Sequence, residues 1–236
     1  MDKAPVFRYE QKYKITSYQM DELKQALSHL LQPDPHAQAN GGYMIRSMYF
    51  DDMYQSAYLE KVDGVYHRKK YRIRVYDCGD RVINLECKNK HGPYIFKESA
   101  RLTRAEYEGI LQGDVDFLLH REEPMAREFF LDYRTKLLRP KVIVDYDREP
   151  YILDAGTVRI TFDREIRAVQ VGESLFDPAA PSYTVYPPGE EILEIKFTGY
   201  LPEFVRRIFQ VRNYTQVSAS KYCLCVDRLR EIGRGE

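Results

Sequence analysis

Charged side chains alternate with apolar ones in two neighbouring segments of the sequence. In YRIRVYD, Arg72 and Arg74 are separated by one residue, and in INLECKNK the same spacing separates Glu86 from Lys88. Residues two apart in a β-strand point to the same face of the sheet. Each segment therefore predicts a strand with one ionic and one apolar face. Arg and Lys bind phosphate oxygens and carboxylates bind hard divalent cations, so such a face suits a chain of phosphates with a metal ion.

The same alternation recurs in other segments. Further residues that share a strand face are Arg8, Glu10, Lys12 and Lys14; Lys97, Ser99 and Arg101; Tyr146 and Arg148; Arg159, Thr161 and Asp163; and Glu194 and Lys196. In a single antiparallel strand, a polar face usually meets bulk water. The repetition instead favours a closed sheet with the ionic faces inside and apolar helices outside. Unpaired charges in a dry interior are costly, so this interior must hold water and an anionic ligand.

The hydrophobic pattern predicts the elements that position these residues. Strands are expected at 6–15, 44–50, 58–61, 69–76, 81–90, 94–102, 141–148, 158–163, 167–169, 183–186 and 191–197. Helices are expected from Thr16 or Ser17 to just before Pro33, from Thr103 to Leu111, from Glu122 to Leu138, from Pro202 to Phe209, and from Ser218 or Ser220 to Gly233. The segments 35–42 and 177–191 are expected to be surface loops. The predicted fold class is α+β, an antiparallel β-barrel tunnel with flanking helices, in a single domain spanning residues 1–236.

Composition limits the classes of function. The 236 residues are 44% hydrophobic and 31% charged, and Lys+Arg and Asp+Glu both total 36. Zero net charge argues against a nucleic-acid partner, so any basic site must be local. The four cysteines have no zinc-ligand spacing and indicate reduced thiols. No apolar stretch resembles a membrane span, and the first 14 residues are too charged for a signal peptide, so we expect a cytoplasmic protein.

Seven motifs, taken together and in order, resemble a known family. They are RYEQKYKI, KYRIRVYD, LECKNK, VIVDYDREPY, VRITFDREI, LEIKF and SASKY. Their order resembles the VTC domain, the polyphosphate polymerase branch of the triphosphate tunnel (CYTH-like) superfamily, over nearly the whole chain. The resemblance implies a tunnel of antiparallel strands, open to solvent, that binds triphosphate with Mn²⁺ or Mg²⁺. Fungal members of the family make polyphosphate from ATP.

The resemblance also assigns residues, motif by motif. Those that resemble the family's phosphate-binding groups are Lys12, Arg72, Arg74, Lys88, Lys97, Tyr146, Arg148, Arg159, Lys196, Ser220 and Lys221. Lys97 follows a loop whose length differs among relatives. The implied metal ligand is Glu194, and Glu10 and Glu86 either assist it or hold basic side chains in place. The residues expected to carry catalysis are Arg72, Arg74, Lys88, Glu194 and Lys221.

One departure bears on the reaction. The first strand reads Arg8-x-Glu10-x-Lys12, where hydrolase and cyclase relatives have Glu-x-Glu-x-Lys. Loss of the first carboxylate weakens a two-metal hydrolytic site and favours transfer of the γ-phosphoryl group of ATP to polyphosphate. Two alternatives stay open: an inorganic or nucleoside triphosphatase in the same tunnel, and a polyphosphate- or nucleotide-binding module without turnover. We expect no membrane segment in the chain itself, while a membrane partner and the oligomeric state are left open.

Overall fold

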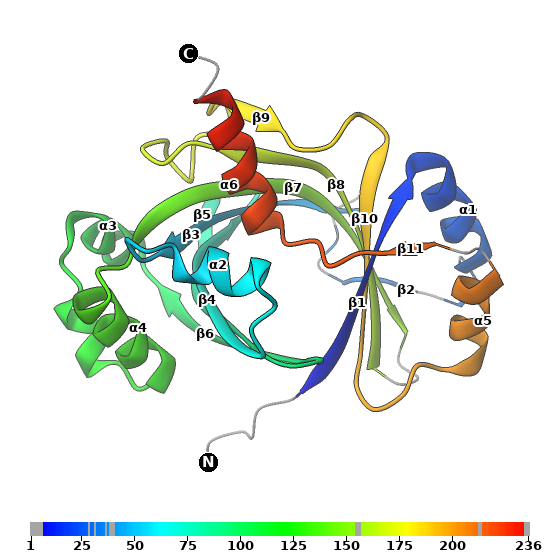
Figure 1. The fold of residues 1–236 in the computed structure, drawn as a ribbon, viewed down its shortest axis with the longest axis horizontal. Helices are drawn as coiled ribbons and strands as arrows, with labels where there is room; N and C mark the ends of the chain where they lie inside the picture. The colour runs from blue at the N-terminus through cyan, green and yellow to red at the C-terminus, as the bar shows by residue number, and fades with distance from the viewer. Residues whose placement is uncertain are drawn as a thin grey trace.

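The computed structural model describes residues 7–27, 29–30, 32–35, 37, 41–153, 157–211 and 214–233. It has an α+β fold, in which helices flank one large antiparallel sheet (Figure 1). The strands are β1 (Arg8–Thr16), β2 (Gln32–Pro33), β3 (Tyr43–Asp51), β4 (His67–Tyr76), β5 (Gly79–His91), β6 (Tyr94–Leu102), β7 (Arg139–Leu153), β8 (Val158–Val169), β9 (Ser182–Thr184), β10 (Glu190–Phe197) and β11 (Thr215–Gln216). The helices are α1 (Ser17–Leu27), α2 (Ser56–Val62), α3 (Arg104–Gln112), the 3₁₀ helix η1 (Asp116–His120), α4 (Pro124–Thr135), α5 (Glu203–Val211) and α6 (Lys221–Ile232).

The sheet closes into a ring. Its strand order is β7-β3-β4-β5-β6-β1-β10-β8, and β8 pairs in turn with β7. The ring is uneven and not a regular barrel, because β6 and β1 pair only at Arg8↔Ile95 and Tyr9↔Tyr94 within the described residues. The β4–β5 hairpin turns at Asp77 and Cys78, which have φ angles of 51° and 53°. Positive φ at both central residues is the requirement of a type I′ turn, which suits the twist of paired strands.

Helices cover the outer, apolar face of the ring on two sides. On one side, Ile73 and Leu85 of the sheet belong to the same buried cluster as Ile110 of α3 and Phe129 of α4. On the opposite side, α1 and α5 pack on β8 and β10 through a second buried cluster (Figure 1). The predicted arrangement, with apolar faces outside under helices, is confirmed. This leaves the alternate residues of the strands facing the interior.

Helix α6 fills one part of the interior. A third buried cluster joins Val144 and Ala168, on the inner face of the ring, to Tyr222 and Val226 of α6. Ser220 caps the start of the helix, and its side chain accepts a hydrogen bond from a backbone N–H of the first turn, as predicted for one of the two candidate caps. The interior is therefore apolar around α6 and ionic elsewhere. Within the described residues, no helix is long and apolar enough to cross a membrane.

Some predicted elements differ from the structure. The strand predicted at 58–61 is wrong, because these residues lie in α2, whose first N–H groups donate to Asp51 and Asp52. Four residues are too few to separate a period of 2 from one of 3.6. The strands predicted at 158–163 and 167–169 are one strand, β8, with an irregularity where Glu165 has a φ of 49°. Helix α1 ends at Leu27, earlier than predicted. The capping box of Thr103 and Glu106 is confirmed, and most of the predicted 35–42 loop lies outside the described residues.

Candidate active site

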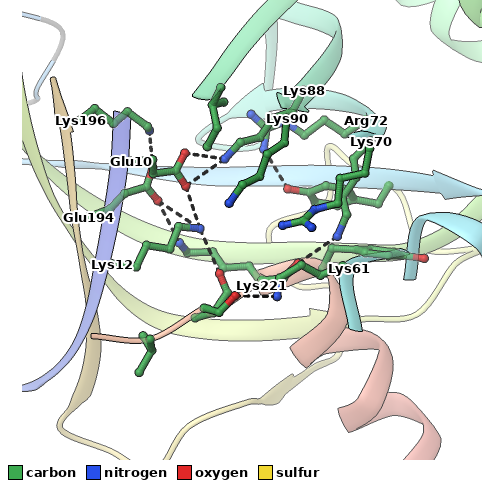
Figure 2. A pocket seen from close by; sticks show the side chains of 18 of the residues that line it. Glu10, Lys12, Lys61, Lys70, Arg72, Lys88, Lys90, Glu194, Lys196 and Lys221 are labelled. Carbon is green, nitrogen blue, oxygen red and sulfur yellow. Dashed lines mark hydrogen bonds and ion pairs between the residues drawn. The ribbon is translucent and has the colours of Figure 1, made fainter. Parts of the chain in front are cut away.

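A basic cavity of 520 Å³ lies inside the ring (Figure 2). Its volume falls in the range of small-molecule sites. Among the described residues, eleven Lys and Arg but only two Glu line it, although the chain as a whole has no net charge. The charged lining residues are Lys12, Lys61, Arg68, Lys70, Arg72, Arg74, Lys88, Lys90, Arg148, Lys196 and Lys221, with Glu10 and Glu194. The cavity is therefore built to hold an anion with several negative charges.

The two glutamates lie on β1 and β10, which pair in the order Lys12↔Glu194 and Glu10↔Lys196. Opposite charges thus face each other across the two strands, the arrangement that favours cross-strand pairing. Lys12 Nζ lies 3.0 Å from Glu10 Oε1 and 3.7 Å from Glu194 Oε2. Lys196 also forms an ion pair with Glu194. We call these four residues, Glu10, Lys12, Glu194 and Lys196, the carboxylate wall.

Both carboxylates of this wall are ionised. Burial by itself would raise the pKa of Glu194, but Lys196, Lys12 and Lys221 outweigh it and hold that pKa well below the usual range. The pKa of Glu10 is likewise lowered, since Lys12 and Lys88 outweigh burial and the repulsion from Glu194. Lys88, on β5, also reaches Glu10, at 2.7 Å. Each acid is neutralised by lysines that a phosphate ligand can attract away.

Glu86 lies behind the cavity and does not line it. Its side chain is fully buried, and its oxygens lie 2.7 Å from Arg72 Nε and 2.6 Å from Lys97 Nζ. Arg72 also donates to the hydroxyl of Tyr49 at 2.8 Å. Glu86 therefore fixes the direction of the Arg72 guanidinium, which is the positioning role considered for it from the sequence. Lys97 points to the same carboxylate and is not part of the described cavity lining.

Asp163 plays the same part for two other cations, and the site residues assigned from the sequence do not include it. The side chain is fully buried on β8. Its two oxygens accept from Arg148 Nε and Nη2 at 2.7 and 2.8 Å, and Lys221 Nζ lies at 2.6 Å. Burial raises the pKa of Asp163, yet Arg148 and Lys221 outweigh it and lower the pKa to about 2. The shared strand face of Arg159 and Asp163 was the sequence signal for an inward carboxylate.

Hydroxyl groups complete the lining. Tyr146 accepts a hydrogen bond from Arg74 Nη2 at 3.0 Å, so its oxygen lies among the arginines. Burial acts to raise the pKa of Tyr146, but Arg148 and Arg74 lower it overall. Ser220 accepts a hydrogen bond from Lys70 Nζ at 3.1 Å at the start of α6. A helix start offers free N–H groups, which favour anions.

Arg159, like Lys97, was assigned to phosphate binding but lies outside the described cavity lining. Its guanidinium lies 2.7 Å from Asp34 Oδ2 and 3.0 Å from the hydroxyl of Tyr43. Of the residues assigned from the sequence, those that the structure does bring together at the cavity are Glu10, Lys12, Arg72, Arg74, Lys88, Tyr146, Arg148, Glu194, Lys196, Ser220 and Lys221.

Four lining cations were not assigned from the sequence: Lys61, Arg68, Lys70 and Lys90. Lys70 shares a strand face with Arg72, and Lys90 shares one with Lys88, so alternation could have found both. Lys61 lies on α2, in the segment that was wrongly predicted as a strand. That prediction therefore did not indicate that the Lys61 side chain lines the cavity.

The carboxylate wall fits a divalent cation only in part. Within the described ranges, no group of three or more His, Cys, Asp or Glu side chains is arranged to hold a metal ion. Mg²⁺ and similar ions commonly take one or two protein carboxylates and complete their coordination with substrate phosphates and water. Glu10 and Glu194, both ionised, match that donor set. A cation here would therefore bind together with a phosphate ligand.

The ring of antiparallel strands and its basic interior define a protein of the triphosphate tunnel class. The VTC domain family matches residues 7–230, and the chain belongs to this family. No curated protein matches the sequence.

Solved structures agree on the fold. The proposed adenylyl cyclase HpAC1 of Hippeastrum, described as having a dominant triphosphatase activity, shares 11% identity over 93% of this chain and 94% of its own, with a TM-score of 0.53. A proposed adenylate cyclase of Bacillus halodurans shares 14% identity over 90% and 93% of the two chains, with a TM-score of 0.50. At this identity the likeness extends to the fold alone.

Proposed function

We propose that the protein is a metal-dependent phosphotransferase that binds the triphosphate of ATP in the cavity and transfers the γ-phosphoryl group to polyphosphate. The observation that carries the proposal is the excess of Lys and Arg over Glu around one cavity of a chain with no net charge. Membership of the VTC family supports a protein that acts on triphosphates.

Positioning and charge neutralisation are the chemistry that this cavity offers. Phosphoryl transfer asks for little covalent participation by the protein. An oxygen of the terminal acceptor phosphate forms a bond to the γ-phosphorus, while the bond from that phosphorus to the β,γ-bridging oxygen breaks. ADP leaves with the bridging oxygen, and the acceptor becomes one phosphate longer. The attacking oxygen is already ionised, so no general base is needed.

Different residues of the cavity would stabilise the transferred group and hold the metal ion. Arg72, aimed by Glu86, and Arg148 and Lys221, aimed by Asp163, stabilise the charge on the transferred group. The lysines that neutralise the carboxylate wall turn to the phosphates when ATP binds, which frees Glu194 and Glu10 for a Mn²⁺ or Mg²⁺ ion. That ion, when bound, supplies further positive charge at the phosphate oxygens.

Hydrolysis is the second candidate function. If water takes the place of the acceptor phosphate, the same cavity makes an inorganic or nucleoside triphosphatase. The triphosphatase activity described for the Hippeastrum protein of similar fold is the observation in its favour. The third alternative is a module that binds polyphosphate or nucleotide without turnover. The four free cysteines agree with a reducing compartment, and we propose the cytoplasm.

One experiment separates these functions. Purified protein is incubated with ATP and Mn²⁺, with and without a short polyphosphate primer, and products are resolved by phosphorus NMR and gel electrophoresis. Chains longer than the primer, formed together with ADP, are the expected result. Free phosphate or pyrophosphate without chain growth would show that the protein is a hydrolase and not a transferase. Intact ATP in a protein that binds it would leave a binding module, and omission of Mn²⁺ tests the metal requirement.

A further inference from the structure

The cations of the cavity differ in whether a carboxylate neutralises them. Lys12, Lys88 and Lys196 have ion-pair partners in Glu10 and Glu194. Arg72 is held by Glu86, and Arg148 and Lys221 are held by Asp163, as described above. These six cations and their four acids form an ion-pair network over β1, β4, β5, β7, β8, β10 and α6.

A second group has no such partner. Among the described residues, no carboxylate lies within 4.0 Å of the side-chain nitrogens of Lys61, Arg68, Lys70 or Lys90, which we call the basic cluster. Lys61 Nζ donates to Ser218 Oγ at 2.8 Å, and Arg68 Nη1 donates to the carbonyl of Val65 at 2.7 Å. These contacts are to neutral groups and do not compensate the charges of Lys61 and Arg68.

Part of the basic cluster lies across the cavity from the carboxylate wall, because β4, which carries Arg68 and Lys70, is opposite β10 in the ring. Lys90, on β5, is close enough to Glu10 for that carboxylate to act to raise its pKa. Lys61 comes from α2, Arg68 and Lys70 come from β4, and Lys90 comes from β5. Figure 2 shows Glu10 and Glu194 at one side of the cavity and Lys70 at the other. The two ends of the cavity therefore offer different environments to an anion.

The clustering of these cations is unfavourable without a ligand. Lys70 Nζ lies 4.7 Å from the centre of the Tyr222 ring, next to the buried start of α6. Burial lowers the pKa of the Lys70 ammonium to about 8. Burial followed by repulsion from Arg68 lowers the pKa of both Lys61 and Lys90. A group of partly desolvated like charges is held together at a cost that an anion would relieve.

A hydrolase and a polymerase place different demands on such a cavity. Hydrolysis brings one polyanion to a neutral water molecule, so one set of cations suffices. Transfer to polyphosphate brings two polyanions together, and their mutual repulsion must be offset by a second set of cations beside the first. Carboxylates belong only at the donor, where they hold the metal ion, because near the acceptor they would add to the repulsion.

We propose that the basic cluster is an acceptor site that binds the end of a polyphosphate chain, while the triphosphate of ATP lies against the carboxylate wall. This inference rests on the proposed function and names the second substrate site within the same cavity. Lys88, which spans from β5 to Glu10, lies between the two sites. The attacking phosphate then approaches the γ-phosphorus from the side of Lys70.

Simultaneous binding tests the acceptor site without turnover. The protein is saturated with a non-hydrolysable ATP analogue and Mg²⁺, and a short linear polyphosphate is titrated in by calorimetry. We expect the parent protein to bind it, and the double variant Lys61→Ala/Lys90→Ala to bind it at least about tenfold more weakly, because two charge-assisted contacts are lost. The matched control is Arg206→Ala/Arg207→Ala, which removes the same charge from exposed positions of α5 and should bind as the parent does. Lys61→Gln/Lys90→Gln repeats the test with side chains that preserve more packing.

The outcomes separate this inference from the proposed function. Exclusion of polyphosphate by the analogue in the parent, or equal affinity of parent and double variant, would overturn the acceptor site. If both ligands bind together but the parent never extends a primer, the acceptor site stands and the transferase does not. If the parent extends primers and the double variant has an unchanged KM for primer, the transferase stands and the acceptor site does not.

Discussion

Asp163 on β8 holds Lys221 at the start of α6 by an ion pair of 2.6 Å between buried side chains. The same carboxylate accepts two hydrogen bonds from Arg148 on β7. One buried acid thus joins α6 to the ring and aims two cations at the cavity. Its removal would leave both cations without their main partner.

Asp163→Asn should therefore lower both stability and anion affinity. Breaking a buried ion pair from one side costs about 3–5 kcal/mol, so we expect a loss of unfolding free energy of about that size. Added tripolyphosphate should restore part of it, since phosphate oxygens can replace the carboxylate. Urea unfolding with and without the ligand measures both effects. The control is Asp116→Asn, which breaks an exposed pair with Arg134 and should cost about 0–1 kcal/mol; equal losses in the two variants would refute the argument.

Glu194→Gln should abolish turnover while sparing anion binding. The substitution removes the proposed metal ligand and one of the two carboxylates among the charged residues described at the cavity. Polyphosphate affinity should stay the same or increase, because repulsion falls. Product formation from ATP and calorimetric titration with polyphosphate are compared. Glu191→Gln is the matched control, since Glu191 lies on the opposite face of β10 and bonds to Ser17. Full turnover in Glu194→Gln would show that the reaction does not require the Glu194 carboxylate.

Arg72→Ala and Lys97→Ala separate direct contact from support. Both side chains bind Glu86, but only Arg72 lines the cavity. Loss of a charge-assisted contact of about 1.5–3 kcal/mol predicts a fall in kcat/KM for ATP of at least about tenfold in Arg72→Ala. A much smaller fall is expected in Lys97→Ala. Steady-state kinetics measures both variants. Equal falls in kcat/KM would show that Lys97 also contacts the phosphates directly. Unchanged turnover in Arg72→Ala would contradict the assignment of the tunnel as the active site.

Arg159→Ala should change phosphate affinity less than twofold. The resemblance to the family assigns Arg159 to the phosphates, whereas the structure pairs it with Asp34 and Tyr43. Equilibrium binding of tripolyphosphate to this variant and to Arg148→Ala gives the comparison. A loss in Arg159→Ala as large as that in Arg148→Ala would mean that Arg159 turns to the ligand when it binds.

Anion affinity should fall as the pH rises above about 8. Burial lowers the pKa values of Lys70 and Lys196 to about 8 in the free protein, although Glu194 acts to raise that of Lys196. A bound phosphate chain favours the charged form and raises both values. Binding at pH 8.5 is therefore coupled to proton uptake, whereas at pH 6.5 both lysines are already charged and no uptake is expected from them.

Calorimetric titrations in two buffers of different ionisation enthalpy count the protons taken up. Lys70→Arg keeps the charge at all these pH values and should reduce the uptake at pH 8.5. The absence of proton uptake in the parent protein at pH 8.5 would show that these lysines do not approach the ligand.

The alternation of charged and apolar residues along the sequence was sufficient to predict most of the strands and the character of both faces of the sheet. The shared ionic face of Arg72 and Arg74, and that of Glu86 and Lys88, follow from a period of 2, which is a local property of an extended chain. The capping box at Thr103 is also local, since it depends on residues three apart. The strand predicted at 58–61 was wrong because four residues fit a period of 2 as well as one of 3.6, and tertiary contacts made the segment helical.

The sequence by itself determined the family, the α+β class and which side chains share a strand face, because motifs and alternation are written along the chain. Only the tertiary structure decided which faces meet. Closure by the β7–β8 pairing places β10 across from β4, and α6 occupies part of the interior. Hence Asp163 holds Arg148 and Lys221, Arg159 pairs with Asp34, and Lys70 lies across the cavity from Glu194 (Figure 2). These relations depend on register, shear and long-range packing, which residue spacing within one strand does not encode.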